Sequence, residues 1–200
     1  MQNRLRLPNF RFLIVIWTVL FLSGCGINNI PTYKQQVNAA WSQVQNEYQR
    51  RADLIPNLVA TVKGYATHEQ KVLTEVTDAR AKVTQTRIPS DILTNPVAFK
   101  AFEKNQATLS GALSRLMVVT ENYPNLKADQ NFLTLQAQIE GTENRIAVAR
   151  RDYILAVQRY NTELVTIPGR WWRSLLYSDA KVMQNFTISQ QAMQVPKVQF

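Results

Sequence analysis

The sequence has few of the residues on which enzymes and metal proteins depend. Its 200 residues include one cysteine, Cys25, and one histidine, His68. A single cysteine excludes a disulfide within the chain, so the fold must be stable without one. A zinc site lacks its Cys and His ligands, and a di-iron site in a helical bundle needs Glu-x-x-His pairs that do not occur here. We therefore expect no metal and no cofactor.

Motifs of catalysis are also missing. The chain has six glycines, no G-x-S-x-G elbow and no glycine-rich phosphate loop. His68 stands beside Glu69, but such a pair on a helix is usually part of its polar face. We predict that the protein is not an enzyme and has no catalytic residue.

Long hydrophobic runs are absent too. The longest apolar run, Phe12–Leu22, has 11 residues, whereas a membrane-spanning helix needs about 20. Three arginines precede this run, and the small residues Ser23 and Gly24 follow it. This order is typical of a secretory signal. The alternative is a tilted span over residues 14–30, which would be a poor one.

The lone cysteine ends the stretch LSGC, residues 22–25. This stretch resembles the bacterial lipobox, in which a peptidase cuts just before the cysteine and the cysteine carries lipid. The resemblance implies that Cys25 becomes the N-terminus and bears a diacylglyceryl group and an N-acyl chain such as palmitate. Two or more acyl chains make a stable membrane anchor, at about 0.8 kcal/mol per buried CH₂. The alternative is a buried or reactive cysteine beside an ordinary cleavage site.

Cleavage before Cys25 would leave 200 − 24 = 176 residues, enough for one domain with a core. The expected organisation is a lipoprotein signal peptide, a tether, a helical bundle and a C-terminal tail, over residues 1–24, 25–31, 32–168 and 169–200. Twenty basic and 14 acidic residues remain after cleavage, a net charge of +6. A basic surface suits anionic lipid or cell-wall polymer, and export makes nucleic acid the least expected partner.

Apolar residues recur at alternating steps of three and four in four segments. The clearest series runs from Phe132 to Tyr160, and others lie within residues 37–48, 58–83 and 99–116. Such seams are typical of helices that pack on helices at shallow angles. We predict an all-α fold, an elongated antiparallel up-and-down four-helix bundle with an N-terminal anchor segment and an irregular C-terminal tail.

Prolines and capping residues predict where the helices end. The expected helices cover residues 32–52, 55–87, 96–122 and 127–166. Asp53 would cap the second helix, with Pro56 in its first turn, where a missing N–H costs little. Alternatively, the first helix continues through Pro56 and kinks there.

Two polar residues, Glu69 and Gln106, fall at predicted seam positions. Polar groups in a seam cost stability and often set the register. We favour a register device or a solvated end of the seam. The alternative is a buried polar site that meets Arg50, Arg51 or Lys63.

The most unusual local stretch is GRWWRSLLY, residues 169–177. Trp171 and Trp172, with the arginines beside them, suit a membrane interface or a partner groove. Equally, the tryptophans could close the open end of the bundle, because bundle ends need apolar caps.

Residues 40–73, AWSQVQNEYQRRADLIPNLVATVKGYATHEQKVL, closely resemble the signature of the LemA family. The match continues in ENYPNLKA at 121–128, in residues 132–153 and in the terminal PKVQF at 196–200. The resemblance implies a long antiparallel four-helix bundle outside the cytoplasm, tethered at its N-terminus. Members have no established enzymatic activity and no agreed cofactor.

Two departures from the family pattern bear on location and on the tail. Members commonly keep an uncleaved N-terminal membrane helix, which would place the protein at the inner membrane. Here LSGC replaces it, and Gly26 after the cysteine implies the outer membrane, facing the periplasm. The stretch around Trp171 also differs from the family's usual small-residue segment.

The expected role is that of a non-enzymatic, lipid-anchored scaffold or adaptor with an unidentified envelope protein as its partner. Alternatives are a lipid-binding bundle and an accessory subunit of an envelope or cell-wall enzyme. The candidate interaction patch comprises Arg50, Arg51, Asn57, Lys63, Trp171 and Trp172. The four residues from Arg50 to Lys63 could form a binding patch with the turn at Tyr123, or an internal network that fixes this turn.

Overall fold

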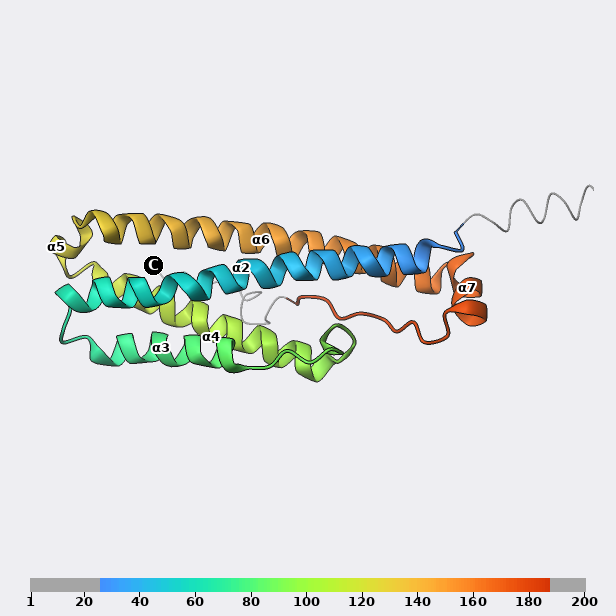
Figure 1. The fold of residues 1–200 in the computed structure, drawn as a ribbon, viewed down its shortest axis with the longest axis horizontal. Helices are drawn as coiled ribbons and strands as arrows, with labels where there is room; N and C mark the ends of the chain where they lie inside the picture. Colours follow the sequence, from blue (N-terminus) through green and yellow to red (C-terminus); the bar gives the residue numbers. More distant parts are fainter. Residues whose placement is uncertain (1–25, 188–200) are drawn as a thin grey trace, which may run out of the picture.

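The protein is an elongated helical bundle in the computed structural model, which describes residues 26–187 (Figure 1). Every regular element in this range is a helix. Four long helices alternate in direction along the rod, namely α2 (Asn29–Tyr65), α3 (Gln70–Gln85), α4 (Pro96–Thr120) and α6 (Gln130–Val165). This arrangement confirms the predicted all-α antiparallel bundle. Among the described residues, no helix has an apolar stretch long enough to cross a bilayer.

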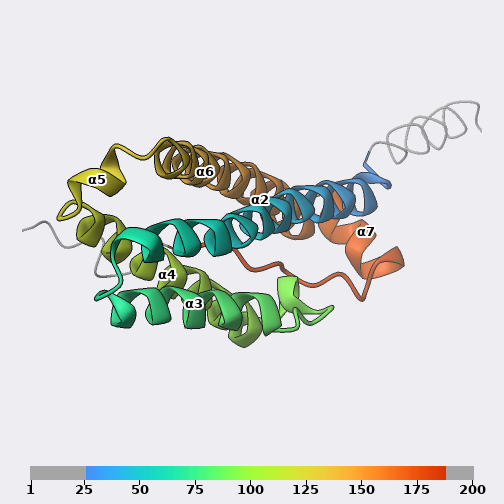
Figure 2. The ribbon, with the colours of Figure 1, turned by 60° about the vertical axis from the view of Figure 1, so that its left-hand side comes forward.

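The long helices differ greatly in length. α2 has 37 residues and α6 has 36, so at a rise of about 1.5 Å per residue each is about 55 Å long. α3 has only 16 residues and lies beside one half of α2. Short helices complete the chain: η1 (Ile92–Thr94), α5 (Pro124–Lys127) and α7 (Gly169–Leu176). α5 and α7 lie at opposite ends of the rod (Figure 2).

The difference in helix length divides the core into two clusters. In the half that contains α3, aliphatic residues such as Leu58, Val76 and Leu116 pack together. In the other half the cluster is aromatic, and it includes Trp41 and Phe99. The second cluster is completed by the segment after α7, which runs back along the rod in place of a fourth helix (Figure 1).

This returning segment, residues 177–187, is irregular but well packed. Ala180, Met183 and Phe186 are buried in the aromatic cluster. The ring of Phe186 lies 5.1 Å from that of Phe99 and 5.4 Å from that of Tyr153. The chain after the bundle is therefore part of the core.

Hydrogen bonds from the bundle hold the backbone of the returning segment. The amide of Asn161 donates Nδ2–H to the carbonyl of Met183 and accepts from its N–H, both at 2.9 Å. The hydroxyl of Tyr153 donates to the carbonyl of Gln184 at 2.7 Å. The N–H of Gln184 donates to the carbonyl of Leu93, also at 2.7 Å.

The predicted helix boundaries 32–52 and 55–87 are wrong, and the alternative, that the first helix continues through Pro56, is correct. α2 runs to Tyr65, and the break falls before Gln70. Asp53 does not cap a helix and instead accepts a hydrogen bond from Gln49 at 2.7 Å. The physical reason is the inward face of α2, whose buried residues recur without a slip on both sides of the proline: Val37, Trp41, Val44, Tyr48, Arg51, Ile55, Leu58 and Val62. Burial of this continuous face outweighs the hydrogen bond that the proline cannot make.

Side chains cap the starts of α4 and α6. The carbonyl oxygen of the Asn95 side chain accepts from the N–H groups of Val97 and Ala98, each at 3.1 Å. Asp129 accepts from the N–H of Phe132 at 2.9 Å. This hydrogen bond is the main reason why the pKa of Asp129 lies below its ordinary value. Both starts lie within three residues of the predicted ones.

Candidate functional site

The middle of the bundle contains a buried arginine, Arg51. The seam of α2 advances by steps of four and three through Tyr48, Arg51, Ile55 and Leu58, so Arg51 faces inward. Its side chain is 1% exposed. A fully buried guanidinium is rare in proteins and requires several hydrogen-bonding partners.

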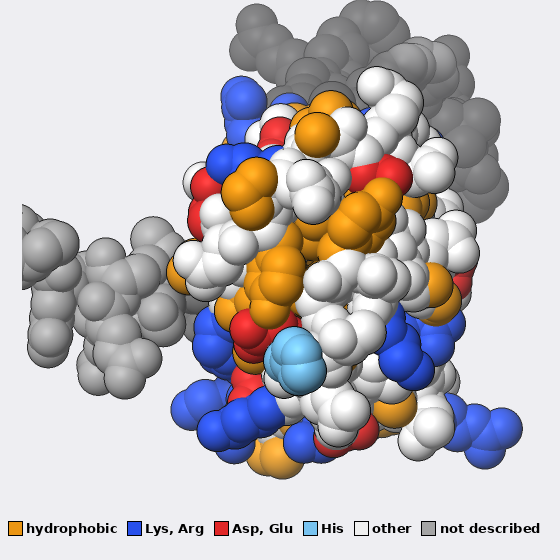
Figure 3. Space-filling view, turned by 90° about the vertical axis from the view of Figure 1, so that its left-hand side faces the viewer, with side chains coloured by type: hydrophobic (Ala, Val, Ile, Leu, Met, Phe, Trp, Pro, Cys, Tyr) orange, Lys and Arg blue, Asp and Glu red, His pale blue; other side chains and the backbone are white. Residues whose placement is uncertain are grey.

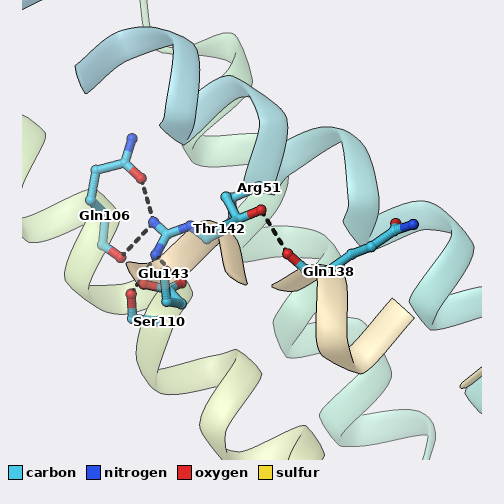
Figure 4. A network of polar contacts seen from close by, with 6 residues as sticks. All are labelled: Arg51, Gln106, Ser110, Gln138, Thr142 and Glu143. Atoms are coloured by element: carbon cyan, nitrogen blue, oxygen red, sulfur yellow. Dashed lines mark hydrogen bonds and ion pairs between the residues drawn. The ribbon is translucent and has the colours of Figure 1, made fainter. Parts of the chain in front are cut away.

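Three residues from two other helices supply acceptors to this guanidinium (Figure 4). Nη1 donates to Oγ of Ser110 and to Oε1 of Glu143, both at 2.7 Å. Nη2 donates to Oε1 of Gln106 at 2.7 Å. Nε has no hydrogen-bond partner among residues 26–187. The network therefore joins α2 to α4 and α6 at one level of the rod.

The charge of Arg51 is balanced from two sides. Glu143 forms the ion pair, and its side chain is 42% exposed, so solvent screens part of the attraction. The ring of Tyr48 lies 5.1 Å from Cζ of Arg51, a cation–π contact. Burial raises the pKa of the Tyr48 hydroxyl although two arginines nearby oppose the rise. Because these contacts join α2, α4 and α6 at one level, the arrangement is suited to fix the register of the three helices.

A second polar cluster reinforces the pairing of α2 with α6. Nε of Arg145 donates to Glu47, a buried residue, at 3.1 Å, and Gln43 donates to the other oxygen of the same carboxylate. Nη2 of Arg145 donates to Oγ of Thr142 at 2.9 Å. The hydroxyl of Thr142 in turn donates to the carbonyl of Gln138, the contact drawn beside Arg51 in Figure 4.

A groove opens beside Arg51, between α4 and α6. It has a volume of about 590 Å³, and its lining includes Lys100, Glu103, Lys104, Gln106, Glu143, Arg150 and Phe186. A second hollow of about 560 Å³ follows along the same two helices and shares Ser110 and Glu143 with the first. Together these two hollows are called the α4–α6 groove below.

The returning segment leads into this groove. Thr187, the last residue that the structure describes, lines it and donates its N–H to Glu103 at 3.1 Å. The guanidinium of Arg150 lies 4.4 Å from the ring centre of Phe186, which closes the same end of the groove. An extended polypeptide thus already occupies the entrance.

The turns at the far end, between α2 and α3 and around α5, form a second candidate surface. The hydroxyl of Tyr123 donates to Glu69 at 3.0 Å, and that of Tyr65 donates to Asp129 at 2.9 Å. The bond to Asp129 is the main reason why the pKa of Tyr65 is raised. Figure 3 shows hydrophobic side chains gathered on this end of the rod. The side chains of Tyr65 and Leu133 are 44% and 43% exposed here.

Comparison with known proteins settles the family. The LemA family model matches residues 40–200, which covers most of the chain and both candidate surfaces. The chain belongs to the LemA family. The earlier resemblance is therefore confirmed.

Two curated relatives show the range of the match. Magnetosome protein MamQ 2 of Paramagnetospirillum magneticum is 25% identical over 160 residues, which cover 72% of this chain and 59% of the relative. Protein LemA of Metamycoplasma hominis is 24% identical over 155 residues, which cover 78% of this chain and 67% of the relative. The chain thus spans about three-fifths of the length of the magnetosome relative.

In this LemA-family bundle the six patch residues proposed from the sequence do not lie together. Arg51 is buried, whereas Arg50, Asn57 and Lys63 are exposed along α2. The turn at Tyr123 meets Glu69 instead of these residues. Trp171 and Trp172 belong to α7, at the opposite end of the rod from α5. Cys25 lies outside the described residues.

The two polar seam residues have different environments. Gln106 is buried and meets Arg51, so for this residue the alternative expectation, a buried polar site, is correct. Glu69 immediately precedes α3, in the turn, and meets none of the three basic residues considered for it. The spacing of the α2 seam, continued by one step beyond Tyr48, would have placed Arg51 in the core. The predicted seam stopped at Tyr48, because the helix was expected to end at residue 52.

The described part of the protein shows no arrangement suited to metal chemistry. Within residues 26–187, no three His, Cys, Asp or Glu side chains are grouped closely enough to hold a metal ion. His68 is exposed in the turn between α2 and α3. The most developed features are therefore the Arg51 network and the α4–α6 groove.

Proposed function

We propose that this LemA-family protein is a non-enzymatic, membrane-tethered scaffold of the cell envelope that holds an extended segment of a partner protein in the α4–α6 groove. Family membership supports the class of protein. The main support for the groove is the packing of the returning segment, residues 177–187. The bundle holds this irregular stretch of its own chain through side-chain hydrogen bonds to the backbone.

The returning segment uses two kinds of contact that a partner could also use. Asn161 and Tyr153 bind its backbone through side-chain hydrogen bonds, which do not depend on the sequence of the bound segment. Phe186 fills an aromatic pocket, which does depend on the sequence. Backbone bonds that give affinity, combined with side-chain pockets that give specificity, are a recurring mode of peptide recognition.

The groove beyond Thr187 continues this surface with charged walls. Lys100, Lys104 and Arg150 line it, against two carboxylates, Glu103 and Glu143. Arg51 is already paired with Glu143 at the groove's base. With Glu143 paired in this way, the exposed Lys100 and Lys104 favour a partner segment that carries carboxylates as well as apolar side chains.

The tether is proposed from the sequence. Lipid on Cys25 would hold the protein in a membrane, and Gly26 after it favours the outer membrane, with the bundle in the periplasm. The intact mass of protein extracted from membranes tests this directly. A chain that starts at Cys25 and carries acyl groups supports the anchor. A chain that starts at Met1 overturns it and favours an inner-membrane helix that includes residues 12–22.

Site-specific photocrosslinking tests the groove. A photoreactive amino acid in place of Ala107, an exposed residue that lines the groove, should give a discrete protein adduct in intact envelopes. The matched control is Val148, which is 59% exposed on α6 and does not line the groove. Lys104→Glu should abolish the adduct, because it reverses a charge on the groove wall. Adducts that map to residues 188–200 of the same chain, or identical adducts from both positions, would overturn the proposal.

A further inference from the structure

α7 and the start of the described chain lie side by side. The backbone of Gly26 approaches Pro168 so closely that a Cβ at this glycine would lie 3.3 Å from the proline ring. Three residues later, Nδ2 of Asn29 donates to Oε1 of Glu163 at 3.2 Å. The chain therefore enters the bundle in contact with Pro168, the residue just before α7.

α7 presents different residues to the bundle and to solvent. Trp172 packs against the aromatic cluster and closes this end of the core. Trp171, one residue earlier, is 58% exposed. Trp172 therefore fits the expectation of a cap of the bundle, whereas Trp171 is exposed to solvent.

Three more large apolar side chains in or beside α7 are exposed, as Trp171 is. Leu175, one turn after Trp171, is 73% exposed, and Leu176 beside it is 57% exposed. Ile167, just before the helix, is 65% exposed. These four residues are called the α7 surface. Large exposed apolar side chains that gather in this way mark a contact with a partner or a membrane.

Basic side chains accompany the α7 surface. Arg170 and Arg173 line a shallow hollow of about 460 Å³ together with Ser174 and Ser178. Nε of Arg173 donates to the carbonyl of Ala180 at 3.0 Å, which fixes this side chain beside the hollow, whereas Arg170 is exposed. The guanidinium of Arg170, together with the Nη groups of Arg173 and the two hydroxyls, is suited to bind the phosphate of a lipid headgroup. A short helix with tryptophan and leucine on one side and arginine on the other is typical of segments that lie in a membrane interface.

The position of Gly26 beside α7 favours a membrane over a protein as the partner of the α7 surface. Residues 12–22 form the longest apolar run of the sequence and lie shortly before Gly26. Any membrane attachment through these residues or through Cys25 brings this end of the rod to the bilayer. We infer that the α7 surface lies on an anionic phospholipid bilayer and forms a second membrane contact beside the N-terminal segment. This inference rests on the proposed membrane tether.

Lipid quenching of fluorescence tests the inference on the full chain in nanodiscs that contain phosphatidylglycerol brominated along its acyl chains. A fluorescent amino acid replaces Leu175 in one variant and Val118 in the other. Val118 is 71% exposed, close to the value for Leu175, but lies near the end of α4 that leads to α5. We expect at least a twofold loss of fluorescence at position 175 and no loss at position 118.

Flotation of the same samples separates failure of this inference from failure of the tether. Protein that floats with the nanodiscs but shows no quenching at 175 retains the tether and overturns the membrane contact of α7. Protein that does not float and is not quenched overturns both. Equal quenching at 175 and 118 means that the rod lies flat, and this result also overturns the inference. Arg170→Glu, a change at an exposed residue, should reduce the quenching at 175 and leave flotation unchanged.

Discussion

The side chain of Arg80, on α3, donates its Nε–H to the carbonyl oxygen of Ala52, on α2, at 2.9 Å. Ala52 lies four residues before Pro56, and proline has no N–H to donate to that carbonyl. Ala52 is 2% exposed, so its carbonyl would otherwise lack a protein donor in a buried setting. Arg80 of α3 thus supplies the hydrogen bond to Ala52 that Pro56 of α2 cannot donate.

Arg80→Met should therefore destabilise the bundle by about 1–3 kcal/mol, the usual effect of leaving a buried acceptor unsatisfied. In a Pro56→Ala background the same change should cost much less, because the N–H of the alanine can donate to Ala52. Urea unfolding of the four proteins in this double-mutant cycle measures the coupling. Equal costs in both backgrounds would show that Arg80 acts only through packing.

Arg51→Lys should cost about 2–4 kcal/mol, because a lysine cannot reach acceptors on α4 and α6 at the same time and leaves charged-group hydrogen bonds unmade. Its neighbour Arg50 is exposed, so Arg50→Lys is the matched control, with an expected change within about 0.5 kcal/mol. The free energy of unfolding in urea provides the comparison. A change below about 0.5 kcal/mol for Arg51→Lys would contradict the proposed register role.

Asn161→Ala should release the returning segment from α6. It removes two hydrogen bonds to Met183, at about 0.5–1.5 kcal/mol each. Hydrogen exchange should accelerate at the amides of residues 180–187 and stay unchanged in α3, which the segment does not cover. Thr162→Ala, on the exposed side of the same helix turn, should leave both regions protected. Uniform acceleration along the whole chain would instead indicate global destabilisation.

Tyr153→Phe should make stability less sensitive to alkaline pH. Burial raises the pKa of the Tyr153 hydroxyl well above its ordinary value of 10.0. The folded protein therefore binds this proton more tightly than the unfolded chain, and its contribution is fully present below pH 10 and is lost as pH rises beyond it. The variant should lose about 1 kcal/mol at pH 7 with its hydrogen bond to Gln184. The difference should shrink above pH 10 in urea unfolding, and a constant difference would contradict this assignment.

The sequence was most informative where one apolar seam ran without interruption. Phe132, Ile139 and Tyr153 were placed in the core by their spacing, and all three are buried there. The same rule, extended along α2 beyond Tyr48, would have placed Arg51 inside as well. The charge of Arg51 and the usual effect of a proline such as Pro56 favoured a helix end instead. The contact from Arg80 that lets the helix continue depends on tertiary structure, so the sequence pattern could not reveal it.

The burial of Phe186 could not be predicted from local pattern, because the returning segment has no helical period. Its place follows from the short length of α3, which leaves one half of the bundle with three long helices. The α4–α6 groove likewise depends on how α4 and α6 pack in the folded protein. Both are properties of the whole fold rather than of any one segment, and Cys25 stays a sequence-based prediction outside the described residues.

The continuity of α2 through Pro56 also has a mechanical consequence. A helix interrupted at residue 53 would have given two short rods joined by a hinge, whereas one helix of 37 residues gives a stiff strut of about 55 Å. The strut begins beside α7 and ends at the turn that contains His68. Whatever surface holds the first end is thereby kept at a fixed distance from whatever meets the second, so the protein can act as a spacer of set length.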